Sequence, residues 1–305
     1  MEFNAEVFEK VPKEEKNVHE IVRPSVTYWQ DAWRRLKENK LAMGGMVFII
    51  LLALAVIFIP MISKNNYYAQ DFTLANLGPS SKHWFGTDKF GRDIFIRILY
   101  GGRISLEIAF AATVLNFVIG VLYGGVAGYV GGSVDNFMMR AVDVIYSVPS
   151  MIYVILLMAV LGGAGLRNII IAMAISLWLT MARIVRSQII TLKQQEFVLA
   201  AKTLGASNSR ILLRHLLPNS MGPIIVTLTL TIPQAIFTEA FLSFIGLGVP
   251  APMASWGTLC SEALEVYMLY PYQLFFPALA ICLTILAFNF LGDGLRDALD
   301  PKMRK

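Results

Sequence analysis

The sequence predicts an all-α membrane protein with six transmembrane helices and with both termini in the cytoplasm. Of the 305 residues 56% are hydrophobic and 15% are charged, and the mean hydropathy is +0.60, more apolar than a soluble domain needs. Several stretches are long and apolar enough to cross a hydrocarbon core of about 30 Å as helices. The basic residues cluster on one side of such a topology.

The six predicted spans satisfy their backbone hydrogen bonds internally, as hydrocarbon requires. They cover residues 41–62, 104–130, 148–165, 168–190, 221–248 and 273–293. The third and fourth are joined by the tight turn GGAG at 162–165, which predicts a helical hairpin. The remaining chain divides into a cytoplasmic tail with an interfacial helix (1–40), an external loop (63–103) and a C-terminal tail (294–305), so that the core is 104–293.

The distribution of basic residues sets the orientation. With the N-terminus inside, 19 of the 26 lysines and arginines lie in cytoplasmic segments and seven lie outside, which favours N-in and C-in. The external loop holds six of those seven: Lys64, Lys82, Lys89, Arg92, Arg97 and Arg103. We expect Asp71, Asp88 and Asp93 to pair with some of them. Arg183 and Arg186, near a span end, are expected to extend their charges to the interface.

Two segments outside the spans are predicted to be amphipathic helices at the cytoplasmic surface. In YWQDAWRRLKENK (28–40), Trp29 and Trp33 lie four residues apart, which predicts an interfacial elbow helix. In SVDNFMMRAVDVIYSVPS (133–150), apolar residues recur on one face and the charged residues lie elsewhere. The second span carries a further pattern, because a glycine stripe permits close approach of another helix. It consists of Gly120, Gly124, Gly128 and Gly132.

A polar insert follows the fourth span and is too long for a simple connection, which takes about two to eight residues. Gln194–Leu204 has helix-favouring composition, Gly205 suits a left-handed C-cap, and Ser207 can cap a second helix that Pro218 interrupts. Small side chains precede the turn and would allow another surface to approach the backbone. The topology places this helix–turn–helix in the cytoplasm, so we expect a soluble protein partner.

The insert resembles the EAA motif of binding-protein-dependent ABC importer permeases. In LAAKTLGASNSRILLRHLLP (199–218), five positions match: Ala200, Ala201, Gly205, Leu217 and Pro218. Leu199 replaces the usual glutamate and His215 the usual isoleucine. Three further stretches resemble the peptide/nickel branch of these permeases: HWFGTDKFGRDIFIRILYGGRISL (83–106, with Ile96 where serine is usual), EAFLSFIGLGVPAPMASWG (239–257) and GDGLRDALDP (292–301). The chain is thereby identified as a C-type permease subunit of that family.

The resemblance implies a type I ABC importer permease fold in a bacterial cell membrane and the import of oligopeptides or dipeptides. It implies that the loop 191–220 couples to a cytoplasmic ATPase through residues Leu199, Ala200, Ala201, Gly205, Ala206, Arg210, Arg214, His215, Leu217 and Pro218. It also implies four partners: a homologous second permease, two ATPase subunits and an extracytoplasmic peptide-binding protein. We expect ATP and Mg²⁺ on the ATPase subunits and no cofactor on this chain, which has no G-x-x-x-x-G-K-[ST] motif.

Acidic residues in the spans are candidates for the substrate pathway. Glu239, with Ser243 one turn later, could meet the amino end of a peptide, or it could make a structural hydrogen bond to a neighbouring helix. Import of a nickel chelate or haem by the same architecture stays open. A proton-coupled transporter using Glu107 and Glu239 is a further alternative, but no inverted repeat is evident.

Three function classes find no support in the residue patterns. A hydrolase is disfavoured because G-x-S-x-G and H-E-x-x-H are absent and the three histidines lie in different segments, so no catalytic or metal-binding residue is proposed. The net charge of +5 reflects basic cytoplasmic loops, and no nucleic-acid partner is expected. The two cysteines, Cys260 and Cys282, are interpreted as packing residues.

Overall fold

The computed structural model describes residues 27–63 and 66–300, and these ranges form helices, loops and one isolated β-bridge between Thr87 and Asp93. The longer helices are α1 (Tyr28–Glu38), α2 (Lys40–Ile62), α3 (Ile94–Val130), α4 (Gly132–Tyr146), α5 (Ser150–Val160), α6 (Leu166–Lys193), α7 (Glu196–Thr203), α10 (Met221–Leu242), α11 (Trp256–Leu264) and α12 (Tyr272–Leu299). Shorter helical pieces are η2 (Phe72–Leu74), α8 (Asn208–Arg210), α9 (Leu217–Asn219) and two π-helical segments, Ile211–Leu216 and Ser243–Leu247.

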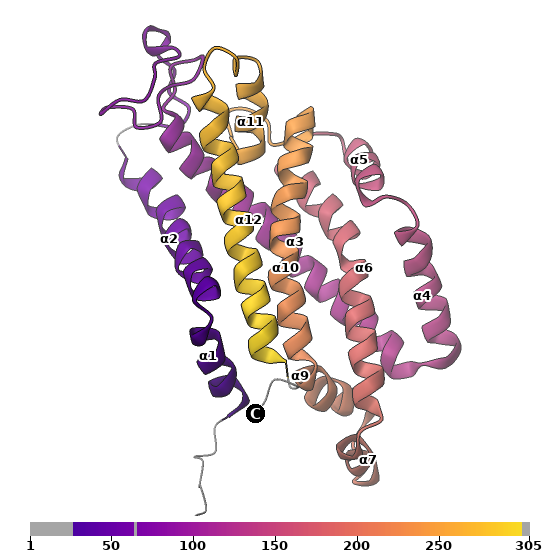
Figure 1. The fold of residues 1–305 in the computed structure, drawn as a ribbon. Coiled ribbons are helices and arrows are strands. Elements are labelled where there is room, and N and C mark those ends of the chain that lie inside the picture. The colour runs from indigo at the N-terminus through magenta and orange to yellow at the C-terminus, as the bar shows by residue number, and fades with distance from the viewer. Residues whose placement is uncertain (1–26, 64–65, 301–305) are drawn as a thin grey trace, which may run out of the picture.

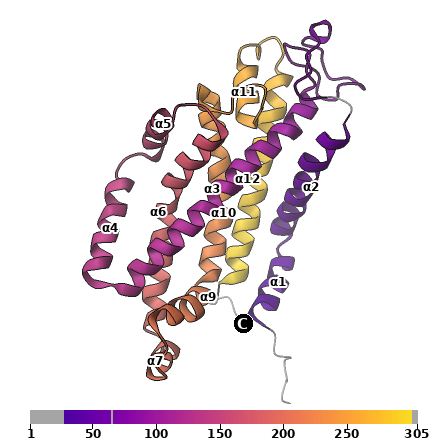
Figure 2. The same ribbon diagram turned by 180° about the vertical axis from the view of Figure 1, so that it is seen from behind.

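Five long helices run between the two ends of the molecule and form its bundle (Figures 1 and 2). They are α2, α3, α6, α10 and α12, and each is long and apolar enough to cross a membrane. α3 crosses the bundle obliquely and packs mainly against α6, while α12 packs against α10 and α2. Five of the six predicted spans are therefore found. The second begins at Ile94 rather than residue 104, and the last extends to Leu299.

The bounds predicted for the third span, 148–165, are wrong. The helix found there, α5, has 11 residues, and at about 1.5 Å per residue it is too short to cross a membrane. It instead forms one candidate span together with α4, which meets it at an angle of 86°. Residues 132–146, predicted to lie flat on the cytoplasmic surface, run beside the bundle in Figures 1 and 2.

Ion pairs explain why α4 lies beside the bundle despite its charges. The guanidinium of Arg186 donates to both carboxylate oxygens of Asp135, at 2.5 and 2.6 Å, and Arg183 donates to Asp143 at 2.7 Å. α6 thus neutralises the two acidic residues of α4. That both arginines extend their charges to the interface stays a prediction, and each is also paired with an aspartate of α4.

The glycine stripe of α3 allows its close contact with α6. A Cβ at Gly120 would lie 2.6 Å from the Cβ of Met181, and one at Gly124 would lie 2.2 Å from the Ala182 carbonyl oxygen. A Cβ at Gly128 would likewise collide with the backbone of α6. The predicted close approach is confirmed at these three positions. Gly132, the fourth, has a φ of +59° in the turn between α3 and α4 and has open space around it.

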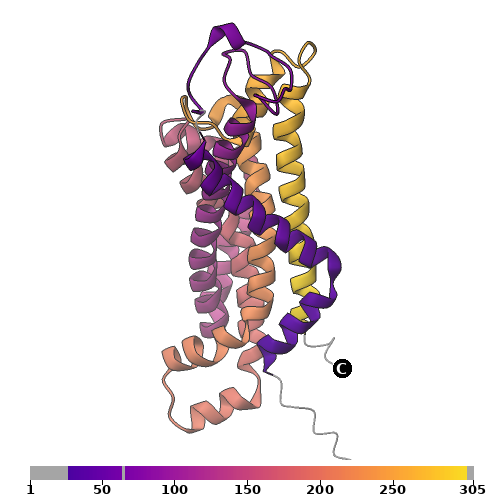
Figure 3. The same cartoon turned by 90° about the vertical axis from the view of Figure 1, so that its left-hand side faces the viewer.

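The predicted elbow helix is present as α1, which packs on α12 and α2 at the end of the bundle where α12 ends (Figures 1 and 3). The Thr27 and Gln30 side chains form a capping box at its start. Leu36 is buried, whereas Trp29 and Trp33 are exposed. The tryptophans are thus available to the membrane interface, as the amphipathic pattern indicates.

Candidate functional site

The insert between α6 and α10 folds as two helical pieces joined by a turn. α7 ends at Thr203, and Gly205 follows with a φ of +78°, a backbone conformation that residues other than glycine rarely adopt. The amide of Ala206 donates to the Ala201 carbonyl at 3.0 Å, which closes the C-terminus of α7. The predicted helix, glycine turn and second helix are therefore present.

The second piece begins as predicted but continues further. Ser207 caps it, because its Oγ accepts from the Arg210 amide at 3.4 Å. The chain then passes through α8, the π-helical segment Ile211–Leu216 and α9, so Pro218 lies inside the last helical turn and does not end it. Proline is tolerated there because it lies in the first turn of α9.

The insert is attached firmly to the bundle. Val198, Ile211 and Leu216 have no exposed surface and pack in one cluster with α6 side chains that include Met181 and Ile189. A polar contact adds to this attachment, since the Tyr129 hydroxyl of α3 donates to the Asn208 side-chain oxygen at 2.7 Å. At the end of α6, Lys193 donates to the Tyr129 carbonyl and joins α6 to α3. The two helices of the insert are therefore held in a fixed position relative to α3 and α6.

The opposite surface of the insert is exposed and largely apolar. Leu199 is 68% exposed and Leu204 is 88% exposed, and the residue that follows each of them, Ala200 and Gly205, is exposed too. Figure 3 shows α7 projecting beyond the end of the bundle that carries α1. Exposed leucines beside small residues form a surface that a partner protein could cover. We call Leu199, Ala200, Leu204 and Gly205 the insert tip.

The other residues predicted for coupling are divided between the surface and the interior. Arg210, Arg214 and Pro218 are exposed, and neither arginine forms an ion pair within the part of the chain that the structure describes. The remaining four are half-buried: Ala201, Ala206 and Leu217, which pack against the cluster with α6, and His215. Of the adjacent alanines 200 and 201, only the first is thus freely presented.

Glu239 lies in a buried hydrogen-bond network that joins three helices. Its carboxylate accepts from Ser105 of α3 at 2.8 Å and from Ser243 at 2.7 Å, and it has no exposed surface. Ser105 also accepts from the Trp256 amide at the start of α11, and Ser255 donates to Ser243 at 3.2 Å. This geometry corresponds to the structural alternative for Glu239 and Ser243, and their role in the pathway stays a prediction. Glu107, by contrast, is exposed on α3.

Three basic residues of the external loop, Lys89, Arg92 and Arg97, are paired at the other end of the bundle. Asp88 accepts from Arg92 and Arg97, each at 2.6 Å, and Glu262 of α11 accepts from the same two arginines at 2.8 Å. Lys89 pairs with Glu265. The pairing of Asp88 with these cations was predicted. The pairing with Glu262 and Glu265, about 170 residues away in the sequence, was not.

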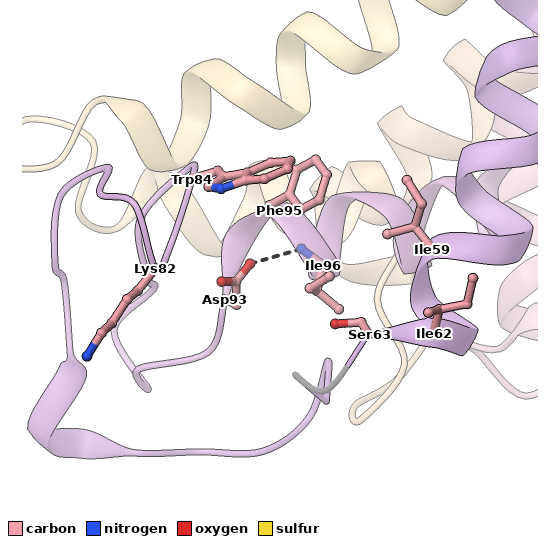
Figure 4. Close-up of a pocket in the computed structure, with 8 residues that line it drawn as sticks. All are labelled: Ile59, Ile62, Ser63, Lys82, Trp84, Asp93, Phe95 and Ile96. Atoms are coloured by element: carbon pink, nitrogen blue, oxygen red, sulfur yellow. Dashed lines mark hydrogen bonds between the residues drawn. The ribbon is translucent and has the colours of Figure 1, made fainter.

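The other two aspartates of this loop act as caps. Asp93 begins α3 by accepting from the Ile96 amide at 3.0 Å (Figure 4). Its second carboxylate oxygen contacts His83. Asp71 accepts from the amide and hydroxyl of Thr73, and no ion pair of Asp71 occurs among the described residues. Figure 4 also shows Trp84 packed against Phe95, beside a groove of about 410 Å³ between the loop and α2.

Within residues 27–63 and 66–300 there is no group of three or more His, Cys, Asp or Glu side chains that could hold a metal ion. His83 belongs to the external loop and His215 to the insert, at opposite ends of the bundle. His19, the third histidine of the sequence, lies outside the described residues.

Comparisons with known proteins assign this architecture. Residues 105–305 match the sequence profile of the family described as binding-protein-dependent transport system inner membrane component. The chain belongs to this family. Residues 27–79 also match the N-terminal TM domain of oligopeptide transport permease C. The protein is accordingly a multi-pass membrane permease, and the motif-based identification of the family is confirmed.

Similar permeases cover almost the whole chain. The oligopeptide transport system permease protein OppC of Bacillus subtilis is 53% identical, over 98% of each chain. The dipeptide transport system permease protein DppC of the same organism is 52% identical, over 97% of this chain and 93% of the relative. Among solved structures, the inward facing MetNI methionine ABC transporter matches with a TM-score of 0.55 and 17% identity, over 68% of this chain and 96% of that chain. That likeness confirms the type I importer fold alone.

Proposed function

We propose that this permease is the C-type transmembrane subunit of an ATP-driven importer of short peptides. The observation that carries the substrate assignment is the identity above 50%, over nearly the full length, to permeases named for oligopeptide and dipeptide transport. The permease of the glutathione transport system, GsiD, from Escherichia coli is 44% identical, and glutathione is itself a tripeptide. Import of a nickel chelate or haem has no comparable support.

The insert is proposed to couple the bundle to a cytoplasmic ATPase. Coupling requires a rigid element that transmits the partner's motion to the spans. The buried side of the insert supplies that rigidity, because Val198, Ile211 and Leu216 fasten it to α6. The insert tip supplies an apolar contact that water otherwise covers. Leu199 occupies the position of the family's glutamate, so docking at this position uses an apolar side chain.

The remaining partners follow from what the sequence lacks. It contains no phosphate-binding G-x-x-x-x-G-K-[ST] motif, so we assign ATP and Mg²⁺ to two separate ATPase subunits. A homologous second permease would complete the pathway, and an extracytoplasmic binding protein would deliver the peptide. A proton relay through Glu107 and Glu239 is disfavoured, because the hydrogen-bond partners of the Glu239 carboxylate are serines inside the protein.

Uptake measurements test this proposal. Cells that carry the complete transporter should accumulate a labelled dipeptide and a labelled pentapeptide, and depletion of ATP should abolish uptake while a protonophore leaves the initial rate unchanged. Leu199→Arg, which places a charge at the insert tip, should reduce co-purification of the ATPase subunits, whereas Leu156→Arg on the exposed side of α5 should not. Uptake that follows the proton gradient would contradict the proposal, as would normal ATPase binding by Leu199→Arg.

A further inference from the structure

A polar groove of about 290 Å³ opens where the bend between α4 and α5 faces α6 and α10. Its polar lining includes Tyr146 and Ser150 at the bend, Thr180 on α6 and Gln234 on α10, together with Tyr153 and Ser176. No charged side chain lines it. The groove is separate from the buried Glu239 network and from the insert, and we call it the α4–α5 groove.

Two polar side chains of this groove lie halfway along helices that cross the membrane. Thr180 is 14 residues after the start of α6 and 13 before its end. Gln234 is 13 residues from either end of the span Met221–Leu247. Both are exposed, and within the described residues neither side chain makes a hydrogen bond. An amide without a partner at this depth is costly in hydrocarbon, so it indicates contact with water or with a polar ligand.

Neighbouring hydroxyls show that α10 otherwise satisfies its polar side chains internally. Thr227, Thr229, Thr231 and Thr238 each donate to the carbonyl oxygen four residues earlier. Such bonds remove the need for any external partner. Gln234 is different, because its side chain is exposed, lines the groove and makes no hydrogen bond within the described residues.

The backbone at the bend points to the same conclusion. α4 ends at Tyr146 and α5 begins at Ser150, with an angle of 86° between them. Non-helical backbone at membrane depth is tolerated only where protein buries it or where it lines a water-filled cavity. Residues 147–150 are exposed, and three of them line the groove. A discontinuous helix beside unpaired polar groups is typical of substrate pathways in transporters.

Aromatic side chains continue from the groove along the exposed side of α10 and of the π-helical segment Ser243–Leu247. Phe237, Phe241 and Phe244 follow Gln234 at intervals of three and four residues, and all are exposed. This spacing puts them on one helical face. Aromatic rings contact peptide side chains of many kinds, and a glutamine amide can both donate to and accept from a peptide bond. A neutral lining also admits peptides of either charge.

We propose that the α4–α5 groove is this subunit's part of the peptide pathway, in which Gln234 and Thr180 hydrogen-bond the main chain of the passing peptide. The inference rests on the proposed function and deepens it, because recognition through the main chain is independent of side-chain sequence. The groove is assigned to a peptide rather than to lipid, since lipid tails offer no hydrogen-bond partner to Gln234.

Accessibility of an introduced thiol tests the groove independently of transport. Gln234→Cys and the control Leu51→Cys, which is 60% exposed on α2, are compared in the assembled transporter after Cys260→Ala and Cys282→Ala replacements. A charged methanethiosulfonate should modify residue 234 at least about tenfold faster, because thiolate forms where water reaches the sulfur. A translocating pentapeptide should slow this reaction. Equal, slow modification of both positions would overturn the proposal, whether lipid or a dry contact with the second permease covers the groove.

Transport kinetics supply the second arm. Gln234→Leu and Thr180→Val should each lower the uptake efficiency for dipeptide and pentapeptide severalfold, mainly through KM, because the lost contacts are to the peptide main chain. The control Thr229→Val removes a hydroxyl that already bonds its own helix and should leave uptake unchanged. Unchanged uptake in Gln234→Leu would overturn the proposal. If the wild-type protein imports no peptide at all, the proposed function fails, whereas slow modification of residue 234 in a peptide-importing protein refutes only the groove.

Discussion

Replacement of Gly124 by alanine should destabilise the contact between α3 and α6. The new Cβ would lie 2.2 Å from the Ala182 carbonyl oxygen, whereas ordinary contacts begin at 3.4 Å, so the two helices must separate by about 1.2 Å. Forcing extra volume into a packed interface costs about 1–3 kcal/mol. Alanine regains up to about 1 kcal/mol through its higher helix propensity. The expected net effect is a lower melting temperature of the purified transporter in detergent.

The next residue provides the matched control. A Cβ at Gly125 would have a single neighbour, Leu212 Cδ1 at 3.9 Å, which is an ordinary contact. Gly125→Ala therefore gains the same helix propensity without the collision and should be neutral or stabilising. The free energies of unfolding of the two variants should differ by about 1–3 kcal/mol in favour of Gly125→Ala. A Gly124→Ala protein that melts at the same temperature as Gly125→Ala, or higher, would refute the close-packing argument.

Three further changes test other contacts. Asp88→Asn removes a carboxylate from the nearly buried Arg97 and should cost about 3 kcal/mol in thermal unfolding, whereas Glu265→Gln, at an exposed pair, should cost less than about 1 kcal/mol. Arg186→Met should expose the α4–α5 segment to limited proteolysis, because it removes both hydrogen bonds to Asp135 of α4. Burial raises the pKa of the Cys260 thiol to about 12, so maleimide labelling of this residue should stay slow from pH 7 to 9 and become fast only on unfolding.

Local signals made most of the fold predictable. Apolar runs of sufficient length marked five spans, and the glycine and serine of the insert marked its turn and cap within a few residues. The early start of α3 could not be predicted this way, since Arg97 and Arg103 end the apolar run. Arg97 is neutralised in part by Glu262, a residue 165 positions later, and no local pattern reveals that pairing.

The bounds of the third span were predicted wrongly for the same reason. Residues 132–146 contain Asp135, Arg140 and Asp143, which by composition favour a surface helix. Asp135 and Asp143 are paired with arginines of α6, and hydropathy does not detect such pairing between distant segments. Pairing between distant segments, rather than local propensity, decides where such a helix lies.

The candidate site was predicted in part. The insert residues were found because capping and small side chains are local features, but the burial of Ala201 on the α6 side depends on tertiary packing. Because a charged residue inside a span is costly, the sequence predicted Glu239 for the pathway, but Glu239 is fully buried. The sequence also holds an uncharged indication of a polar site, because Gln234 is a strongly polar residue in the middle of an apolar run.

Peptide uptake by two proline variants tests most directly the central claim that the insert couples this permease to its energy source. Gly205 in the insert and Gly163 in the external turn have φ values of +78° and +88°, and each amide donates one backbone hydrogen bond. Proline is incompatible with both features, so the local damage is matched. With equal membrane levels, Gly205→Pro should abolish ATP-dependent uptake of dipeptide and pentapeptide while Gly163→Pro retains most of it. Equal uptake by the two variants would contradict the coupling role of the insert.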